Sequence, residues 1–338
     1  MNRVLVTGAA GFVGAAVVTR LLAEGRDVVG VDNLNDYYDV RLKHHRLEPL
    51  RANPRFDFKQ LDIADADAVA RLASDVDGSP IVHMAAQAGV RHSLRQPRDY
   101  VSSNLVGFAN VAELARHAKC PHFVYASTSS VYGLNARRPY RETDSVRHPL
   151  NLYSATKLAN ESIAHAYSHL FAIPMSGLRF FTVYGPAGRP DMSPFIFARK
   201  LLCGETIELF NHGNSVRDYT YIDDIVDGIL AVVNRPSQSD VAFDSSKPVA
   251  DSSSAPFRVF NIGSGKPIIV REYLELLSKA LNVTPRIENR PAQDGDMDAT
   301  HADTTALRTA TGWTPQTSLA EGTSRLAEWC RANPSLLG

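Results

Sequence analysis

The stretch that decides the fold is Val4-Leu5-Val6-Thr7-Gly8-Ala9-Ala10-Gly11-Phe12-Val13-Gly14, an apolar run followed by three regularly spaced glycines. The apolar run predicts a buried β-strand, and the residues from Phe12 onward have the periodicity of an α-helix. A turn of this kind needs backbone without Cβ atoms where the helix approaches the strand and where a phosphate approaches the chain. Free N–H groups at the start of the helix would face that phosphate. The motif therefore predicts a dinucleotide site.

Strands and helices continue to alternate through the first half of the chain. Further apolar runs predict strands at 27–32, 57–63, 80–85, 122–127 and 175–181, with helical patterns at 12–24, 65–74, 98–118 and 153–171. Strands that are apolar on both faces and separated by helices are typical of a parallel sheet covered on both sides. We therefore expect an α/β protein with a doubly wound, Rossmann-type parallel sheet.

The elements become shorter after about residue 182, where a loop holds Pro186, Gly188 and Pro190. We expect helices near 193–202, 223–234 and 271–281, a strand at 207–210, and a mobile loop at 237–256, which is rich in Ser, Asp and Pro. The predicted organisation is a Rossmann domain at 1–181 and a smaller C-terminal substrate-binding lobe at 182–338. Segments near 216–235 and 257–264 are expected to return to the first domain.

The composition excludes several classes of function. The 36 Lys and Arg residues balance the 36 Asp and Glu residues, whereas a nucleic-acid-binding protein would normally carry a basic excess. The three cysteines show neither metal-ligand nor disulfide spacing, which is typical of a reducing compartment. Because the predicted first strand starts at Arg3, we expect no signal peptide, and no apolar run reaches the roughly 18 residues of a membrane span. We expect a soluble, cytoplasmic protein without a metal, nucleic-acid or membrane partner.

Carboxylates follow two of the predicted strands. Asp32 ends the second strand, where it can accept hydrogen bonds from the adenosine ribose and would repel a 2′-phosphate, which favours NAD over NADP. Asp62 and Ile63 end the third strand, where a carboxylate can meet the adenine amino group. The alternative interpretation of Asp32 is a simple helix cap, and Asp62 could equally have a purely structural role.

Tyr153 and Lys157 are four residues apart, so their side chains share one helix face. A free phenol has a pKa of about 10 and is a poor base at pH 7. The Lys157 ammonium and the positive nicotinamide ring would favour the phenolate. Thr128 follows the fifth strand at the ligand-binding edge of the sheet, where its hydroxyl could hold a reacting hydroxyl group. The pattern predicts hydride chemistry on an alcohol. The alternatives are a helix-surface pair and an ordinary strand-end hydroxyl.

The motifs together resemble those of the extended short-chain dehydrogenase/reductases, in the sugar-nucleotide epimerase and dehydratase branch. The likeness covers nearly the whole chain and includes His83-Met84-Ala85-Ala86, Asn104-Leu105-Val106-Gly107, Ser127-Thr128-Ser129-Ser130-Val131-Tyr132-Gly133 and Val216-Arg217-Asp218-Tyr219. Within that branch the chain is most similar to the UDP-glucuronate 4-epimerases, through residues 31–39, 87–91, 180–186 and 188–192.

The resemblance implies NAD-dependent 4-epimerisation of UDP-glucuronic acid to UDP-galacturonic acid through a transient 4-keto sugar, with NAD regenerated in each cycle. It implies Tyr153, Lys157 and Thr128 as the catalytic residues. The cofactor-binding residues that it implies are Gly8, Gly11, Phe12, Val13, Gly14, Asp32, Asn33, Asp62, Ile63, Ala85, Asn104, Ser127, Tyr153 and Lys157. The implied substrate-binding residues are Arg91, Thr128, Ser129, Ser130, Tyr153, Thr182, Arg189, Phe195, Ile207, Leu209, Phe210, Arg217, Gln293 and Asp296.

The run Thr128-Ser129-Ser130 separates the activities within that branch. The resemblance places Thr-Asp-Glu here in 4,6-dehydratases and Thr-Ser-Glu in UDP-xylose-forming decarboxylases. With Ser129 and Ser130 in those positions, elimination of water has no general acid/base there. Their hydroxyls, with that of Thr182, would hold the substrate carboxylate and limit its loss as CO₂. Arg189 would contact the substrate, Arg217 would bind its diphosphate, and Gln293 and Asp296 would bind its uridine.

Three alternatives remain open at this stage: a 4-epimerase of neutral UDP-sugars such as UDP-glucose, a UDP-glucuronate decarboxylase, and a noncatalytic NAD-binding regulator. The regulator would typically lack the tyrosine or the lysine, and this chain has both. The resemblance also implies a homodimer that pairs through the predicted helices at 98–118 and 153–171.

Overall fold

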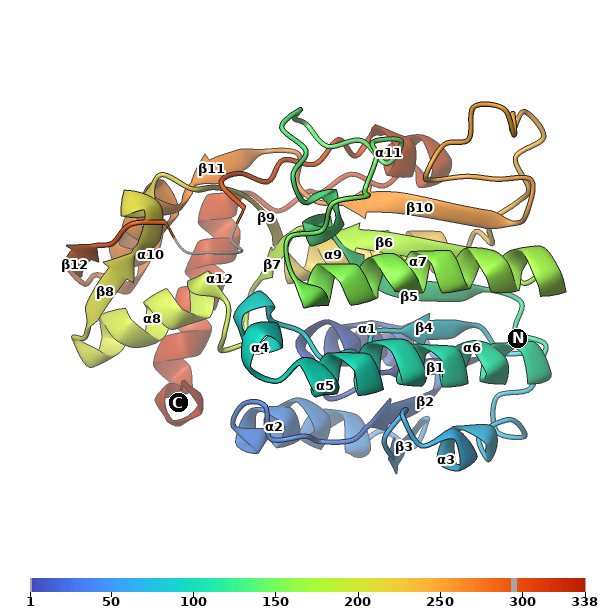
Figure 1. The fold of residues 1–338 in the computed structure, drawn as a ribbon. Helices are drawn as coiled ribbons and strands as arrows, with labels where there is room; N and C mark the ends of the chain where they lie inside the picture. The colour runs from blue at the N-terminus through green and yellow to red at the C-terminus, as the bar shows by residue number, and fades with distance from the viewer. Residues whose placement is uncertain (1, 293–296, 338) are drawn as a thin grey trace.

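Seven parallel strands form the central sheet of the structure, a computed structural model that describes residues 2–292 and 297–337. The strands lie in the order β10-β6-β5-β4-β1-β2-β3 (Figure 1). Their bounds are β1 (Arg3–Thr7), β2 (Asp27–Asp32), β3 (Phe56–Gln60), β4 (Ile81–His83), β5 (Phe123–Thr128), β6 (Met175–Phe180) and β10 (Phe257–Ile262). The strand order reverses direction between β1 and β4, which opens a ligand-binding crevice at the carboxyl ends of these strands.

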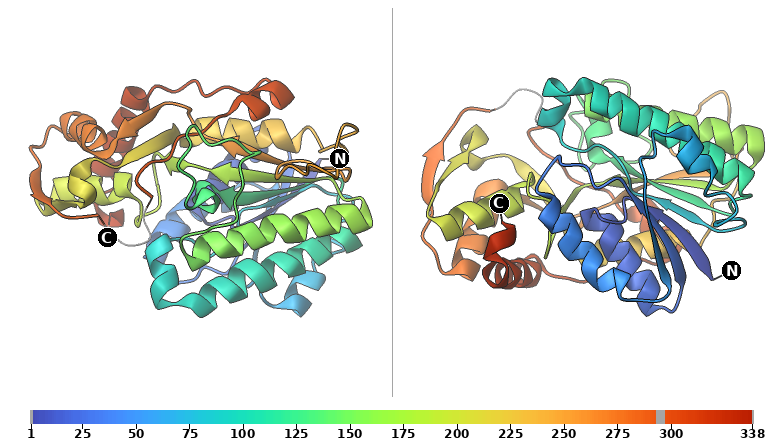
Figure 2. Two further views of the ribbon diagram at one scale, coloured as in Figure 1. Left: turned by 45° about the horizontal axis from the view of Figure 1, so that its top comes forward. Right: turned by 90° about the horizontal axis from the view of Figure 1, so that it is seen from below.

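Helices cover both faces of this sheet. One face carries α1 (Phe12–Ala23), α2 (Val40–Arg51) and α9 (Ile222–Val233), and the other carries α3 (Ala66–Ala70), α6 (Gly107–His117) and α7 (Leu152–Phe171) (Figure 2). The predicted doubly wound, Rossmann-type fold is confirmed. Among the described helices, none is both long and apolar enough to cross a membrane.

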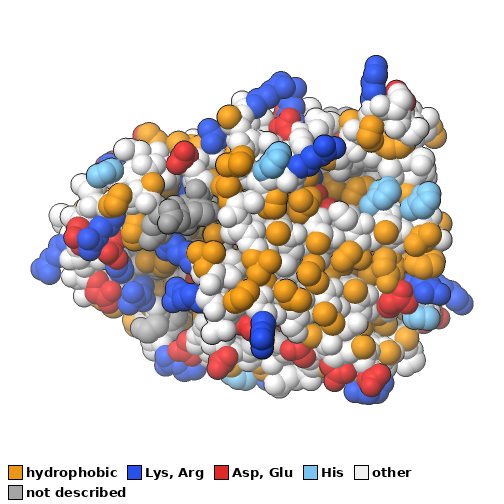
Figure 3. Space-filling view, viewed as in Figure 1, with side chains coloured by type: hydrophobic (Ala, Val, Ile, Leu, Met, Phe, Trp, Pro, Cys, Tyr) orange, Lys and Arg blue, Asp and Glu red, His pale blue; other side chains and the backbone are white. Residues whose placement is uncertain are grey.

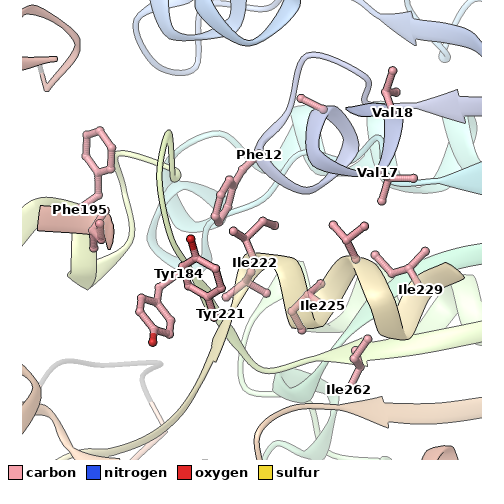
Figure 4. Close-up of a cluster of buried hydrophobic side chains, with 14 of the residues drawn as sticks. Phe12, Val17, Val18, Tyr184, Phe195, Tyr221, Ile222, Ile225, Ile229 and Ile262 are labelled. Carbon is pink, nitrogen blue, oxygen red and sulfur yellow. The ribbon is translucent and has the colours of Figure 1, made fainter. Parts of the chain in front are cut away.

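The core beneath the glycine-rich turn joins residues that lie far apart in the sequence. Phe12 and Val17 of α1 face the isoleucines of α9, among them Ile222 and Ile225, and Val18 belongs to the same buried cluster (Figure 4). All five are buried, and such side chains each contribute about 1.5–3 kcal/mol through loss of contact with water. This packing holds the start of α1 against α9, which begins more than forty residues after the end of β6.

The second half of the chain adds two small sheets and their helices beside the carboxyl edge (Figure 1). One sheet contains β7 (Thr182–Tyr184), β9 (Val216–Tyr221) and β11 (Pro267–Ile269), and the other pairs β8 (Thr206–Leu209) with β12 (Arg286–Asn289). Around them lie α8 (Ser193–Cys203), α10 (Val270–Leu281) and α12 (Leu319–Ala332), whereas α11 (Thr305–Thr311) lies against β10 of the central sheet (Figure 1). We propose the predicted domain division at residue 182 for this arrangement, with α9 and β10 assigned to the first domain because they pack on α1 and pair with β6.

The helix predicted at 98–118 is interrupted in the structure. It consists of α5 (Pro97–Tyr100), the π-helix η1 (Val101–Val106) and α6. Asn104 lies in the π-helix, and its backbone carbonyl accepts a 2.6 Å hydrogen bond from the side chain of Asn160 on α7. A π-helical turn of this kind is often found at a functional site. The interruption depends on a contact with another helix, which periodicity alone does not reveal.

Two other segments differ from the sequence prediction. Helix α2 was not predicted, because its window is rich in charged residues, although Leu42, Leu47 and Leu50 form a buried stripe along it. Strand β3 ends at Gln60 rather than at residue 63, and the Asp62 carboxylate then accepts a hydrogen bond from the backbone of Ala64. The predicted loop at 237–256 contains no helix or strand.

A buried ion pair ties α7 to the sheet. The Arg179 side chain is 0% exposed and that of Glu161 is 6% exposed, and their charged atoms approach to 2.8 Å. The Glu161 carboxylate also accepts a 2.5 Å hydrogen bond from the Ser127 hydroxyl on β5. The pair therefore fixes α7, the helix that carries Tyr153 and Lys157, against β5 and β6.

We expect Glu161→Ala to lower the free energy of unfolding by about 3–5 kcal/mol, because it leaves the Arg179 charge buried without its partner. The measurement is urea denaturation followed by circular dichroism. Glu205→Ala is the control, since the pair of Glu205 with Arg199 is partly exposed and should contribute less than about 1 kcal/mol. Equal losses in the two variants would contradict a structural role for the buried pair.

Candidate active site

A cavity of about 950 Å³ lies at the carboxyl edge of the central sheet. Its wall contains the glycine-rich turn at one end and residues of β8 and β9 from the second lobe at the other. Tyr153, Lys157 and Thr128 lie in the same wall. The structure thus brings most of the predicted cofactor and substrate residues together around one space.

The glycine-rich turn has the close approaches that its sequence predicts. Gly8 has a positive φ of +72°, and a Cβ atom on Gly14 would collide with the Gly8 carbonyl oxygen. Helix α1 begins at Phe12, and no side chain caps its free N–H groups. Gly8, Gly11, Phe12, Val13 and Gly14 all line the cavity. A bare helix N-terminus over an open, glycine-lined surface fits the diphosphate of a dinucleotide.

The carboxylate of Asp32 lies beside this turn. It accepts hydrogen bonds from the Ala10 and Leu34 backbone N–H groups, at 3.1 and 2.9 Å, and lies 3.8 Å from the Lys43 ammonium. The side chain of Asn33 donates to Asp62 at 3.0 Å. Asp32, Asn33, Asp62 and Ile63 all line the cavity, as their predicted contacts with a nucleotide require.

Asn104 is buried and does not line the cavity. Its side chain accepts from the Gln87 backbone N–H at 2.8 Å, donates to the Gln87 carbonyl at 3.0 Å and donates to the Thr156 hydroxyl at 3.0 Å. Its place therefore fits a role in joining the loop after β4 to α7. Ala85, at the start of that loop, lines the cavity, and its N–H donates to the Thr7 hydroxyl at 3.2 Å.

Helix α7 presents Tyr153 and Lys157 to the cavity from consecutive turns. The helix begins at Leu152, and the preceding Asn151 side chain accepts from the Ser154 N–H at 2.9 Å. The Lys157 ammonium donates to the Ala126 carbonyl at 2.9 Å. Burial lowers the pKa of Lys157 to about 8, so the side chain stays mostly protonated at pH 7.

The ionisation of Tyr153 depends on burial and on three neighbouring side chains. Burial raises the pKa of Tyr153, while the Arg189 charge and a hydrogen bond from Thr128 lower it and the Asp191 charge raises it. Arg189 and Thr128 thus favour the phenolate, and the sequence did not predict this effect for either of them. A phenol placed in this way, beside a dinucleotide site, can exchange a proton with an alcohol.

Hydroxyl groups cluster beside Tyr153. Thr128 is the last residue of β5, and its hydroxyl accepts a 3.2 Å hydrogen bond from the Ser130 N–H. Ser129 and Ser130 begin the 3₁₀-helix η2 (Ser129–Tyr132), and both line the cavity with Thr182 and Ser127. The predicted group of substrate-facing hydroxyls is therefore brought together.

Arg189 forms an ion pair in the cavity wall. Its guanidinium donates to the Asp191 carboxylate at 3.0 Å, and the Tyr37 hydroxyl donates to the same carboxylate at 3.0 Å. Arg91 lies over the Phe210 ring at 5.3 Å and also lines the cavity. Both arginines are therefore placed where a substrate could reach them.

The far end of the cavity is formed by Ile207, Leu209, Phe210 and Arg217. Arg217 donates to the Val216 carbonyl at 2.9 Å and the Asp298 carbonyl at 3.4 Å. Its alternative interpretation, a salt bridge with the neighbouring Asp218, does not hold. The Asp218 carboxylate is buried and accepts instead from Ser264, Gly265 and Ala302.

Phe195 lies in the hydrophobic core and is absent from the cavity wall. Its ring belongs to the buried cluster of Figure 4, with its centroid 5.9 Å from that of the Trp329 ring, and the neighbouring Ile196 and Phe197 of α8 line the cavity instead. The rotation of α8 about its axis decides which side chains face the substrate, and the sequence did not settle it. The predicted uridine contacts Gln293 and Asp296 lie outside the described residues.

Several residues of this site were not predicted, among them Tyr37, Lys43, Arg46 and Asp191. Lys43 and Arg46 lie on α2 and are 4% and 6% exposed. A lysine and an arginine are rarely buried unless they have partners. Their position beside the apolar stripe of α2 was the signal that could have identified them. Within the described ranges 2–292 and 297–337, no group of three or more His, Cys, Asp and Glu residues could hold a metal ion.

Comparisons with known proteins agree with this geometry. A model of the NAD dependent epimerase/dehydratase family matches residues 4–263. A probable UDP-glucuronate 4-epimerase of Rhizobium meliloti is 42% identical over 333 residues, which cover 98% of this chain and 97% of that protein. Two solved structures are also similar. One is the UDP-glucuronic acid 4-epimerase of Bacillus cereus in complex with UDP-glucuronic acid and NAD, with 30% identity, a TM-score of 0.86, and coverage of 98% of this chain and 99% of that chain. The other is the UDP-glucose 4-epimerase of Thermotoga maritima with UDP-glucose, with 29% identity, a TM-score of 0.85 and the same coverage.

Proposed function

The chain belongs to the NAD-dependent epimerase/dehydratase family, and on that basis we propose that it is an isomerase that converts UDP-glucuronic acid to UDP-galacturonic acid. The observation that carries the proposal is the Thr128-Ser129-Ser130 run at the cavity wall beside Tyr153. These residues offer hydroxyl groups to a sugar carboxylate, and they offer no carboxyl group for the elimination of water. The relatives that are described as UDP-glucuronate epimerases support the same substrate.

NAD, when bound, would accept a hydride from the sugar at C4 and return it to the opposite face. The glycine-rich turn would hold its diphosphate and Asp32 its adenosine ribose. Thr128 would hold the C4 hydroxyl for Tyr153, which would remove its proton as a phenolate and later give it back. Arg189 and Thr128 favour that phenolate. Lys157 would hydrogen-bond the nicotinamide ribose.

A carboxylate is lost as CO₂ when its C–C bond lines up with the π system of the neighbouring ketone. Ser129, Ser130 and Thr182 would hold the carboxylate of the 4-keto sugar out of that alignment. At the other end of the cavity, Arg217 would bind the diphosphate, and Ile207, Leu209 and Phe210 would flank the uracil. A 4-epimerase of neutral UDP-sugars would not need this cluster of hydroxyls, so the cluster favours the uronate.

Incubation of the purified chain with UDP-glucuronic acid that carries deuterium at C4 should yield UDP-galacturonic acid as the main product. The product should retain the deuterium at C4. Liquid chromatography with mass spectrometry measures both. Tyr153→Phe should lower turnover by about 10²–10⁴-fold, since the base is removed, while the variant still binds NAD. Deuterium lost to solvent, UDP-xylose as the main product, or comparable rates with UDP-glucose would each contradict the proposal.

The pH profile of turnover should change in Thr128→Val. The phenolate is the active form, so turnover rises with pH through the pKa of Tyr153. The Thr128 hydrogen bond lowers that pKa, so its removal should move the acid limb of the profile to higher pH, by roughly one unit for a loss of about 1.4 kcal/mol. The control is Ser162→Ala, on the exposed face of α7. An acid limb at the wild-type pH in Thr128→Val would remove Thr128 from this role.

We propose that two copies pair through the face formed by η1, α6 and α7. Apolar side chains gather on this face (Figure 3), and Val101, Val106 and Leu170 are 44%, 46% and 69% exposed. Light scattering should give twice the chain mass of 37.0 kDa, and Val106→Glu should give the single mass because it places charge in the interface. Val241→Glu, on the loop before β10, is the control. A wild-type chain of single mass would contradict the dimer.

We also propose the cytoplasm as the location of the enzyme. Cys120, Cys203 and Cys330 are all free thiols, which fits a reducing compartment. Cell fractionation would test the location, and recovery of the protein outside the cytoplasmic fraction would contradict it.

A further inference from the structure

Arg46 is a buried cation that the chemistry described above does not use. Its guanidinium carries five N–H donors, and each of them has an acceptor. Two donate to the Ala187 carbonyl at 3.0 and 2.8 Å, and one donates to the Gly188 carbonyl at 3.1 Å. The other two donate to the Ala10 carbonyl at 3.0 Å and to the Tyr38 hydroxyl at 2.7 Å.

The acceptors of Arg46 belong to two segments with different tasks. Ala10 lies within the glycine-rich turn, and Ala187 and Gly188 directly precede Arg189, which lines the cavity. Ala187 has a positive φ of 51°, a conformation that residues with a side chain rarely adopt. The two hydrogen bonds from Arg46 to its carbonyl help to hold this conformation. The side chain thus connects the cofactor turn directly to the loop that carries Arg189.

The charge of Arg46 lacks a carboxylate partner. Lys43 lies 3.8 Å from Asp32, and Arg189 is paired with Asp191, but Arg46 forms an ion pair with no carboxylate among the described residues. Burial lowers the pKa of Arg46, and the nearby Arg189 adds to this, although Tyr38 and Asp32 oppose it. A buried cation without a counter-charge is unfavourable. The diphosphate of a dinucleotide at the adjacent turn would supply negative charge at this place.

We propose that Arg46 is a positioning residue that couples the two ligand sites, so that NAD at the glycine-rich turn and a nucleoside diphosphate sugar at the Arg189 loop each tighten the binding of the other. The sugar-nucleotide half of this inference rests on the proposed function. Such coupling is reciprocal, because the same free energy links both binding equilibria.

The test measures the dissociation constant of UDP-glucose with and without saturating NAD, and that of NAD with and without UDP-glucose, by calorimetry on the nucleotide-free full-length chain. In the wild type each ligand should tighten the other by about fivefold or more. In Arg46→Met the ratio of each dissociation constant without the second ligand to that with it should fall to about one. NAD alone should bind roughly tenfold more weakly. In Arg46→Lys the charge remains and NAD binding should be largely kept. The ratio should still fall, because an ammonium cannot reproduce the planar fork of donors.

Arg51→Met is the matched control, since Arg51 ends the same helix and is exposed. It should keep the wild-type ratio. A wild type without coupling, or Arg46→Met and Arg46→Lys variants with the wild-type ratio, would overturn the inference. If circular dichroism shows that Arg46→Met is unfolded, the ratio in Arg46→Lys decides. A chain that binds and couples NAD and UDP-glucose but does not epimerise UDP-glucuronic acid would refute the proposed function and leave this inference standing.

Discussion

The close approach of α1 to β1 is the constraint on which the rest of the site depends. The Gly8 carbonyl occupies the space that a Cβ atom on Gly14 would need, so the helix can begin directly over the end of the strand. Both polar groups of Ala10 in this turn are then held by side chains, the N–H by Asp32 and the carbonyl by Arg46. The turn is therefore fixed by groups from β2 and α2, and its uncapped N–H groups remain available to a phosphate.

Burial gives the proposed catalytic side chains, Tyr153 and Lys157, their chemical character. It raises the pKa of Tyr153 and lowers that of Lys157, so it opposes the charge on both residues. The phenolate therefore needs help from nearby groups, and here that help comes from Arg189 and Thr128. The loop that carries Arg189 thus influences the proposed proton acceptor. The same loop is fastened to the cofactor turn by Arg46, which links binding and proton transfer through one set of contacts.

The sequence was sufficient where local spacing decides the structure. The Gly8–Gly14 motif and the alternation of strands and helices predict the sheet, and the spacing of Tyr153 and Lys157 predicts their shared helix face. It was insufficient where tertiary contacts decide. The π-helix at Asn104 depends on Asn160, and the inward rotation of Phe195 depends on how α8 packs. Arg46 could not be assigned a role because its acceptors come from segments far along the chain.

The position of Asp191 adds a further argument about the reaction. Elimination of water from a 4-keto sugar needs a carboxyl group that can both give and take a proton, and Asp191 is near enough to influence Tyr153. Burial alone would raise the pKa of Asp191, but the Arg189 charge and hydrogen bonds from Arg189 and Tyr37 outweigh it and hold the pKa below its usual value. Asp191 is thus kept as an anion engaged by two partners and is a poor acid. With hydroxyls at Ser129 and Ser130, the catalytic centre favours the return of hydrogen to the sugar over the loss of water.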